Sequence, residues 1–161
     1  MKEKDPRITD IGIKLGIKTA QIHARCQIVS KNPLILIDGA HNPESVLALY
    51  QVIHNIIKKK VIVIFGTSQG KLVDKMFKIL SPITNHFILT QSENPRHIPV
   101  TQLAEMLKLY NIPFSMTNSV KKAVKQGLVL TDRKTSLVIT GSFYVASEAL
   151  KLFKKPPKNK M

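Results

Sequence analysis

The chain has 161 residues, of which 43% are apolar, and a formal net charge of +15. This length suits one domain whose core is large enough to fold without disulfides or structural metals. Its single cysteine, Cys26, excludes an intrachain disulfide and fits a reducing compartment. No apolar run approaches the roughly 18 residues of a membrane span, and the first residues lack the apolar core of a signal peptide. We therefore expect a cytoplasmic protein with no membrane partner.

The large positive charge raises the alternative of a basic nucleic-acid-binding protein. The lysines, however, are spread along the chain, and their densest cluster lies at residues 151–160. The three tyrosines and six phenylalanines do not alternate with basic residues, as they would on a surface that stacks bases. Nucleic acid is therefore the less favoured partner.

The weak patterning of residues 1–20 indicates a lead-in or linker. Residues 24–29 then predict a short strand, residues 30–33 a turn, and residues 34–38 a fully apolar strand. The close turn favours antiparallel pairing of these two strands as a hairpin.

From there, apolar β-branched runs that predict strands alternate with apolar residues at helical spacing that predict helices. Further strands are expected at residues 61–65, 86–90, 114–117 and 137–140. Helices are expected at residues 44–58, 71–80, 100–110 and 143–152, and Ser119 is expected to cap another helix that runs through residue 129.

Short apolar strands that alternate with helices are typical of a parallel sheet covered on both faces. The sequence therefore predicts an α/β fold: a Rossmann-like, mixed but mostly parallel sheet of five or six strands, with helices on both faces. We expect one such domain at residues 21–152, preceded by the lead-in at residues 1–20 and followed by a basic tail at residues 153–161.

Asp38 and His41 follow the first fully apolar strand, at the sheet edge where open α/β folds bind ligands. A carboxylate at this place can accept hydrogen bonds from the two hydroxyls of a ribose. His41 could stack on a base or form a hydrogen bond with a sugar or phosphate. The alternative is that Asp38 caps the turn or helix and His41 only fills the loop.

Two later strand ends carry further polar groups. Arg96, close to Asn94, could bind a carboxylate or phosphate, or it could be a solvated residue of a capped turn. Gly141 permits close approach of the backbone, and Ser142 lies at a helix start, where it either helps to bind an anion or simply caps the helix. If these groups meet Asp38 and His41 at one edge of the sheet, all of them form one ligand cleft.

Several other chemistries are disfavoured by the sequence. Residues 66–71 (Gly-Thr-Ser-Gln-Gly-Lys) resemble a phosphate loop but have one residue too few between the glycines, and Leu72 stands where a Ser or Thr would hold Mg²⁺. No Gly-x-Ser-x-Gly elbow and no paired metal-ligand spacing of histidines occurs. Cys26 is interpreted as a buried packing residue of a strand.

Residues 37–43 (Ile-Asp-Gly-Ala-His-Asn-Pro) closely resemble the Asp-Gly-Ala-His-Asn-Pro signature of the folylpolyglutamate synthase/dihydrofolate synthase family, within the Mur ligase superfamily. Residues 24–27 (Ala-Arg-Cys-Gln) resemble the family's Gly-Arg-x-Glu stretch, residues 93–96 (Glu-Asn-Pro-Arg) its Asn-Pro-Arg, and residues 140–144 (Thr-Gly-Ser-Phe-Tyr) its Gly-Ser-Leu-Tyr. These matches follow the family's order over roughly residues 20–152, which correspond to its C-terminal domain alone.

The resemblance implies an ATP- and Mg²⁺-dependent ligase that adds L-glutamate to dihydropteroate or folates through an acyl phosphate. It implies that Arg25 contacts the nucleotide phosphates, that Asp38 binds the ribose and that His41 lies beside the nucleotide. Ser142, and more weakly Asn94 and Arg96, would lie on the side of the incoming glutamate.

This chain departs from the family pattern in two places and lacks one domain. Ala24 replaces a glycine, and residues 68–71 (Ser-Gln-Gly-Lys) lack the family's Asp-Lys pair. The family's N-terminal ATPase domain, with its phosphate loop and Mg²⁺ ligands, is not in the sequence. No complete catalytic set is therefore expected here, and we expect the chain to be inactive by itself. The alternative is a stand-alone nucleotide- or anion-binding module without ligase activity.

Overall fold

A computed structural model describes residues 24–132 and 134–153. Within them, one six-stranded sheet has the order β1-β2-β6-β3-β4-β5. Its strands are β1 (Gln27–Lys31), β2 (Leu34–Ile37), β3 (Val61–Phe65), β4 (Thr84–Leu89), β5 (Phe114–Met116) and β6 (Leu137–Thr140). β1 pairs antiparallel with β2, and every other pairing is parallel. The predicted mixed, mostly parallel sheet is confirmed.

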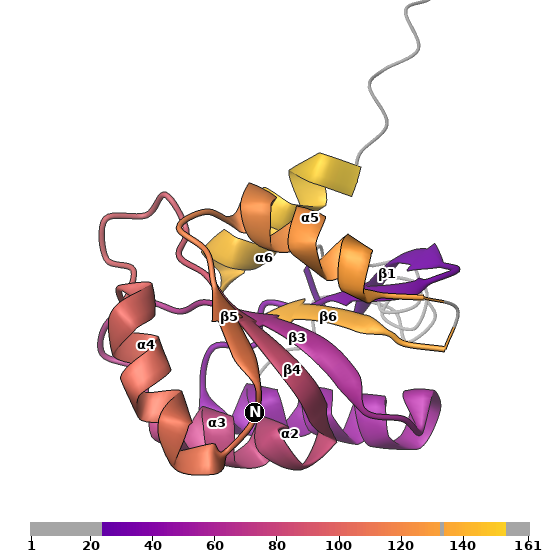
Figure 1. Cartoon of the computed structure of the whole chain (residues 1–161), viewed down its shortest axis with the longest axis horizontal. Helices are drawn as coiled ribbons and strands as arrows, with labels where there is room; N and C mark the ends of the chain where they lie inside the picture. The colour runs from indigo at the N-terminus through magenta and orange to yellow at the C-terminus, as the bar shows by residue number, and fades with distance from the viewer. Residues whose placement is uncertain (1–23, 133, 154–161) are drawn as a thin grey trace, which may run out of the picture.

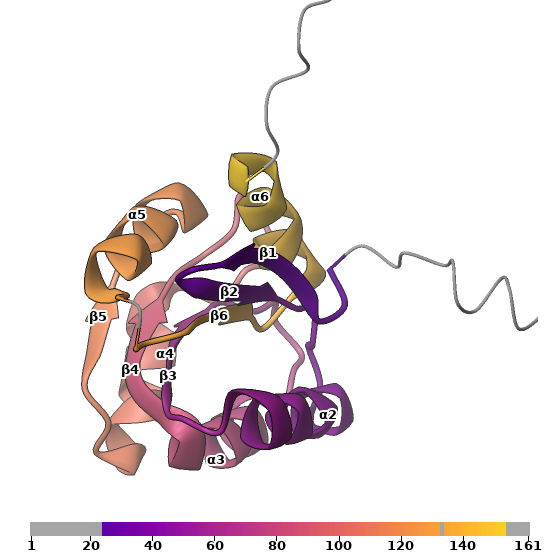
Figure 2. The same cartoon turned by 90° about the vertical axis from the view of Figure 1, so that its right-hand side faces the viewer.

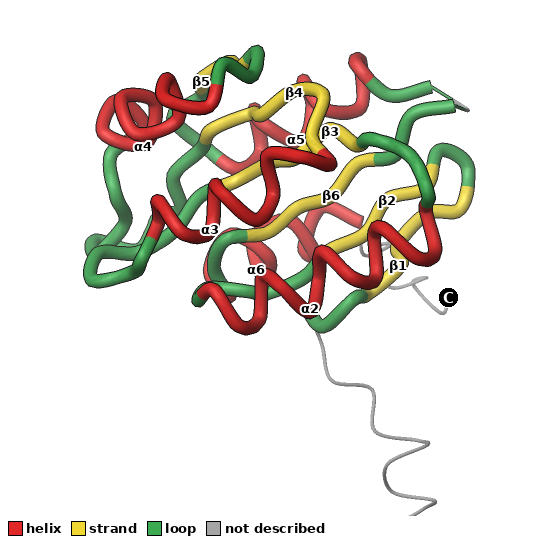
Figure 3. Tube along the Cα trace, turned by 90° about the horizontal axis from the view of Figure 1, so that it is seen from below, coloured by secondary structure: helices red, strands yellow, loops and turns green. Residues whose placement is uncertain are grey.

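The helices form two layers, one on each face of the sheet (Figures 1 and 2). One face carries α2 (Pro43–Val52), α3 (Val73–Leu80) and α4 (Val100–Leu107); Figure 3 shows α2 and α3 in front of the strands and α4 beside β5. The other face carries α5 (Val120–Leu130) and α6 (Phe143–Phe153). Short turns of other helix types extend three of them: η1 (Ile53–Ile57), η2 (Ser81–Ile83) and η3 (Lys108–Tyr110).

The residues of β3 show why the sheet is covered on both faces. Its five residues are all buried, and successive side chains of a strand point to opposite faces. Val61, Val63 and Phe65 pack with α2, α3 and α4, whereas Ile62 and Ile64 pack with α5 and α6. An uninterrupted apolar run is what a strand with two covered faces requires.

The chain reverses its winding between β2 and β6. These strands are parallel neighbours, but β2 leads into α2 on one face and β6 leads into α6 on the other. Diverging connections leave a crevice beyond the carboxyl ends of the two strands, where open α/β sheets bind ligands. Gly141, directly after β6, has φ +108° and packs against the backbone of Gly66 after β3, so a side chain at this position would be both strained and obstructed.

The predicted bounds differ from the observed ones at several places. The first strand is displaced: β1 begins at Gln27 and includes Ser30 and Lys31, because Ala24 and Cys26 have positive φ and cannot extend the strand. The second helix begins at Val73, two residues later than expected. The fourth strand, β4, begins at Thr84, two residues earlier than expected.

The expected lead-in at residues 1–20 lies outside the described residues, as does all of the expected basic tail except Phe153, which ends α6. No helix in the part of the chain that the structure describes is long and apolar enough to cross a membrane.

Candidate functional site

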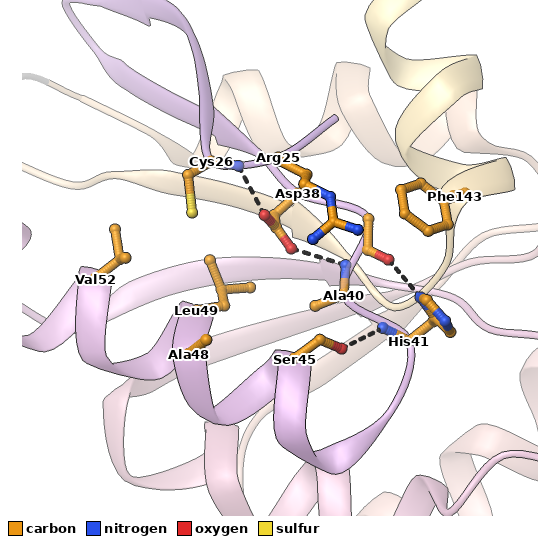
Figure 4. Close-up of a pocket in the computed structure, with 11 residues that line it drawn as sticks. Arg25, Cys26, Asp38, Ala40, His41, Ser45, Ala48, Leu49, Val52 and Phe143 are labelled. Atoms are coloured by element: carbon orange, nitrogen blue, oxygen red, sulfur yellow. Dashed lines mark hydrogen bonds between the residues drawn. The ribbon is translucent and has the colours of Figure 1, made fainter. Parts of the chain in front are cut away.

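A hollow of about 230 Å³ opens at the crevice beyond β2 and β6 (Figure 4). Arg25, Asp38 and His41 supply its polar groups. Its apolar surface comes from Ala48, Leu49 and Val52 of α2 and from Phe143, the first residue of α6. The sheet thus brings together three residues that the sequence analysis singled out, from the segments before β1 and after β2.

Asp38 is 8% exposed and accepts two backbone hydrogen bonds. The Cys26 amide donates to its Oδ2 and the Ala40 amide donates to its Oδ1, each at 2.7 Å. The carboxylate therefore ties the turn before β1 to the loop after β2, as the turn-capping alternative predicted. Each carboxylate oxygen has a second lone-pair direction, so these bonds leave acceptor capacity for a ligand.

Arg25 lies in a tight turn before β1. Its neighbours Ala24 and Cys26 have φ +59° and +42°, and the Ala24 carbonyl accepts a bond from the Gly39 amide at 2.6 Å. Positive φ is uncommon for residues with a side chain, so this turn is held by its bonds to the loop after β2. Arg25 is thereby fixed against Asp38 through the backbone of its neighbours.

The interpretation of Cys26 as a buried strand residue is wrong, because it is an exposed residue of this turn. Its thiol lies against Asp38, and partial burial, the Asp38 charge and a hydrogen bond to Asp38 raise its pKa to about 11. A thiol with so high a pKa carries little thiolate at neutral pH. Cys26 is therefore a poor nucleophile despite its position in the hollow.

His41 is oriented by the start of α2. Its Nδ1 donates to the Gly39 carbonyl at 2.9 Å, since a carbonyl oxygen can only accept, and its backbone amide donates to Ser45 Oγ at 3.1 Å. Ser45 and Asn42 form a capping box, in which the Ser45 amide donates to Asn42 Oδ1 at 2.8 Å. In the neutral ring, Nε2 is left as an acceptor for a ligand.

A second hollow, of about 170 Å³, adjoins the first. It is lined by His41, Ser68, Gln69, Lys71, Arg96, Ser142, Phe143 and Tyr144. Ser68 Oγ is buried without a hydrogen-bond partner, as are Thr67 Oγ1 and Thr140 Oγ1 at the ends of β3 and β6. A buried unpaired hydroxyl is costly unless a ligand or water satisfies it, so Ser68 is a candidate ligand contact that the sequence analysis did not find.

Of the three residues expected on the second side of the cleft, two line this hollow. Arg96 reaches it, and Ser142 lies in it while its Oγ accepts the Val145 amide at 3.1 Å, as an N-cap does. Asn94 lines neither hollow: its Oδ1 accepts the Arg96 amide at 2.9 Å and so shapes the loop that carries Arg96. Asn94 is therefore placed as a support for that loop rather than as a lining residue.

The charges around the two hollows favour an anionic ligand. Arg25, Lys71 and Arg96 line them, while Asp38 is the one acidic residue among the described lining residues and already accepts two amides. Within residues 24–132 and 134–153, no group of three His, Cys, Asp or Glu residues is placed to hold a metal ion. The three basic lining residues suit the site to phosphates or carboxylates.

The fold and the site define an α/β domain with an anion-accepting cleft at the carboxyl ends of parallel strands. The family model described as "Mur ligase, glutamate ligase domain" matches residues 24–143, and the chain belongs to this family. A dihydrofolate synthase/folylpolyglutamate synthase of Buchnera aphidicola is 29% identical over 144 residues, which are 87% of this chain and 34% of that protein. The chain therefore spans about a third of the length of this relative.

Solved structures of such enzymes are also similar to this chain in fold. A bifunctional folylpolyglutamate synthase/dihydrofolate synthase of Yersinia pestis, complexed with AMPPNP and Mn, is 26% identical with a TM-score of 0.79 over 90% of this chain and 34% of that one. Another structure of such an enzyme has Mn, AMPPNP and L-glutamate bound, at 26% identity and a TM-score of 0.80 over 90% of this chain and 35% of that one. A folylpolyglutamate synthase of Mycobacterium tuberculosis, complexed with ADP and AMPPCP, shares the fold with a TM-score of 0.83 at 23% identity, over 94% of this chain and 37% of that one.

Proposed function

We propose that this chain is the C-terminal part of an ATP-dependent ligase that adds L-glutamate to dihydropteroate or folates through an acyl phosphate. The observation that carries the proposal is the cleft beyond β2 and β6, in which Arg25, Asp38 and His41 meet within the segment that the glutamate ligase family model matches. The ATPase domain that the reaction needs would be the N-terminal part of the same enzyme. The single cysteine makes the cytoplasm the expected location.

The first hollow is the proposed nucleotide site. Arg25 would hold phosphate oxygens through its planar guanidinium, which suits a charge that is spread over several oxygens. Asp38 would accept the ribose hydroxyls with its remaining lone pairs, and His41 would lie beside the nucleotide. The apolar surface from Leu49 and Val52 fits a nucleoside better than a fully hydrated ion. ATP would supply the phosphoryl group that activates the carboxyl substrate.

The second hollow is the proposed site of the incoming L-glutamate. Lys71 and Arg96 would bind its carboxylates, and Ser68 and Ser142 would offer hydroxyls. The Nε2 acceptor of neutral His41, which lines both hollows, could take a hydrogen bond from the amino group that attacks the acyl phosphate. Asn94 would support Arg96 through the loop rather than touch glutamate.

Mg²⁺ is required by the proposed reaction, but the described residues do not fit a site for it. Their one carboxylate in the hollows, Asp38, is engaged by two amides, and Mg²⁺ prefers octahedral oxygen ligands. We therefore assign no step to a metal held by this chain and expect the N-terminal ATPase domain to hold it.

Calorimetric titration of the 161-residue chain with ADP tests the proposed nucleotide site. We expect weak binding that Arg25→Ala weakens further but leaves measurable, whereas Lys121→Ala, which removes the same charge from the exposed face of α5, leaves binding unchanged. Binding of a random DNA duplex that falls steeply with salt, without any ADP binding, would favour the nucleic-acid alternative. A nanomolar ADP affinity would contradict the view that the site is completed by another domain.

A ligation assay tests the activity. We expect no glutamate incorporation from ATP, Mg²⁺, L-glutamate and dihydropteroate with this chain alone. Adding the separately produced N-terminal two thirds of the Buchnera aphidicola relative should restore turnover, and Arg25→Ala should prevent it. Full activity of the chain alone would refute the proposal that the reaction also needs the N-terminal ATPase domain.

A further inference from the structure

Phe143 occupies an unusual position between the two hollows. Only Phe143 and His41 line both of them among the described residues, and the Phe143 side chain is 42% exposed. The ring therefore lies between the proposed nucleotide site and the proposed glutamate site, and Figure 4 shows it at the edge of the first of them.

The ring of Phe143 contacts both polar residues beside it. The Arg25 guanidinium carbon lies 6.0 Å from the ring centroid, at the limit of a cation–π interaction. The His41 ring lies 5.1 Å from it, centroid to centroid, at an angle of 48°. An aromatic ring in this place restricts where both side chains can go.

The loop after β2 is shaped to admit this ring. A Cβ at Gly39 would overlap Phe143 Cδ1 and Cε1, so the ring lies directly against the bare Cα of Gly39. Gly39 does not have a positive φ, and the need for glycine here therefore comes from the ring rather than from the backbone. The Gly39 amide also donates a hydrogen bond to the Ala24 carbonyl, next to Arg25. This bond joins the loop after β2 to the turn before β1, beside the ring at the start of α6.

We infer that Phe143 is a positioning residue: its ring holds the Arg25 guanidinium and the His41 imidazole in the orientation that binds the nucleotide. This inference rests on the proposed function, because it assumes a nucleotide in the first hollow. A purely structural role, in which Phe143 only covers Gly39, would affect stability but would not act through Arg25.

The test is a double-mutant cycle in ADP affinity, measured by calorimetry on the full chain. A cation–π interaction at an exposed site corresponds to a loss of about two- to fivefold, which we expect for Phe143→Leu. Phe143→Tyr keeps the ring and should bind as the wild type does. Gly39→Ala should reproduce the loss, because it displaces the ring without changing Phe143. In the Arg25→Gln background, Phe143→Leu should cause a smaller loss, because only its effect on His41 remains.

Ring-proton resonances of His41 give a readout that needs no ligand. Phe143→Leu should shift them by removing the ring current, and Phe143→Tyr should not. Equal ADP affinity of wild type and Phe143→Leu, or losses that add fully with Arg25→Gln, would overturn the inference while leaving the nucleotide site intact. Absence of ADP binding by the wild type would instead refute the proposed nucleotide site, and unmoved His41 resonances in Phe143→Leu would then refute the positioning role as well.

Discussion

Asp38→Asn should destabilise the fold measurably, apart from any effect on ligand binding. The carboxylate accepts the amides of Cys26 and Ala40 with one oxygen each, at 2.7 Å. An asparagine keeps one acceptor, and its NH₂ group then faces the second amide, which is left without a partner. A buried unsatisfied donor costs about 1–3 kcal/mol. Because the Cys26 amide is only partly buried, we expect a loss of about 2 kcal/mol for Asp38→Asn and about 4 kcal/mol for Asp38→Ala.

Urea unfolding of the chain, followed by circular dichroism, measures this loss. For a domain of this size, 2 kcal/mol lowers the urea midpoint by about 1 M. Glu105→Gln is the matched control, because it removes the same charge from an exposed carboxylate that pairs with the surface Lys108, and it should cost less than about 0.5 kcal/mol. An Asp38→Asn midpoint indistinguishable from that of the control would refute the reasoning that this carboxylate holds the turn and the loop together.

Three further outcomes follow from titratable groups. Burial lowers the pKa of His86, so the His86 term in the free energy of unfolding should be constant above about pH 6.5 and should fall below it, because the unfolded chain takes up the proton first. The variant His86→Gln can still form a hydrogen bond with Ser115 and should remove this fall, which is measured as the difference in unfolding free energy between about pH 5 and pH 7.5. Burial and the hydrogen bond to Asp74 raise the pKa of Tyr110 to about 12, so the stabilisation that Tyr110 contributes should be present below about pH 10 and be lost between about pH 10 and 12. In Tyr110→Phe, the unfolding free energy measured with urea should therefore depend less on pH over that range. The Cys26 pKa of about 11 predicts iodoacetamide alkylation at pH 8 roughly a hundredfold slower than that of a free thiol, which mass spectrometry can follow; a rate equal to that of glutathione would contradict it.

The parallel part of the fold could be predicted because its signals are local. Each central strand is an apolar run with polar residues at both ends, and β3 and β6 have the predicted bounds. The alternation of strands with amphipathic helices then leaves few topologies, since parallel connections must cross over the sheet. Local sequence patterns of this kind do not depend on residues that are distant in the sequence.

The turn before β1 could not be predicted, for the opposite reason. Ala24 and Cys26 adopt positive φ because the loop after β2 binds their backbone, and neither residue type signals that conformation. The π-helical turn η1, which ends at Lys58 with φ +55°, has no pattern in the sequence either, and residues 44–58 were predicted as one regular helix.

The location of the site could be predicted from the sequence, but the hydrogen-bond partners of its polar groups could not. Polar residues at strand ends indicate a cleft, and His41, Arg96 and Ser142 do line one hollow. Which of these groups is free depends on contacts that only the structure shows, such as the use of Asn94 Oδ1 by the Arg96 amide. Phe143 falls within the stretch that resembles the family's Gly-Ser-Leu-Tyr, but its residue type did not single it out, because an aromatic residue at a helix start is equally consistent with packing.

Among the residues that the structure describes, β6 is the last strand along the chain, and it lies in the middle of the sheet, where it pairs with both β2 and β3. A growing or truncated chain that stops before Leu137 therefore leaves both of those strands with an open hydrogen-bonding edge, and unpaired apolar edges recruit other chains. During synthesis the sheet can close only after nearly the whole domain has left the ribosome. Fragments that stop before Leu137 are accordingly expected to aggregate rather than to form a smaller domain.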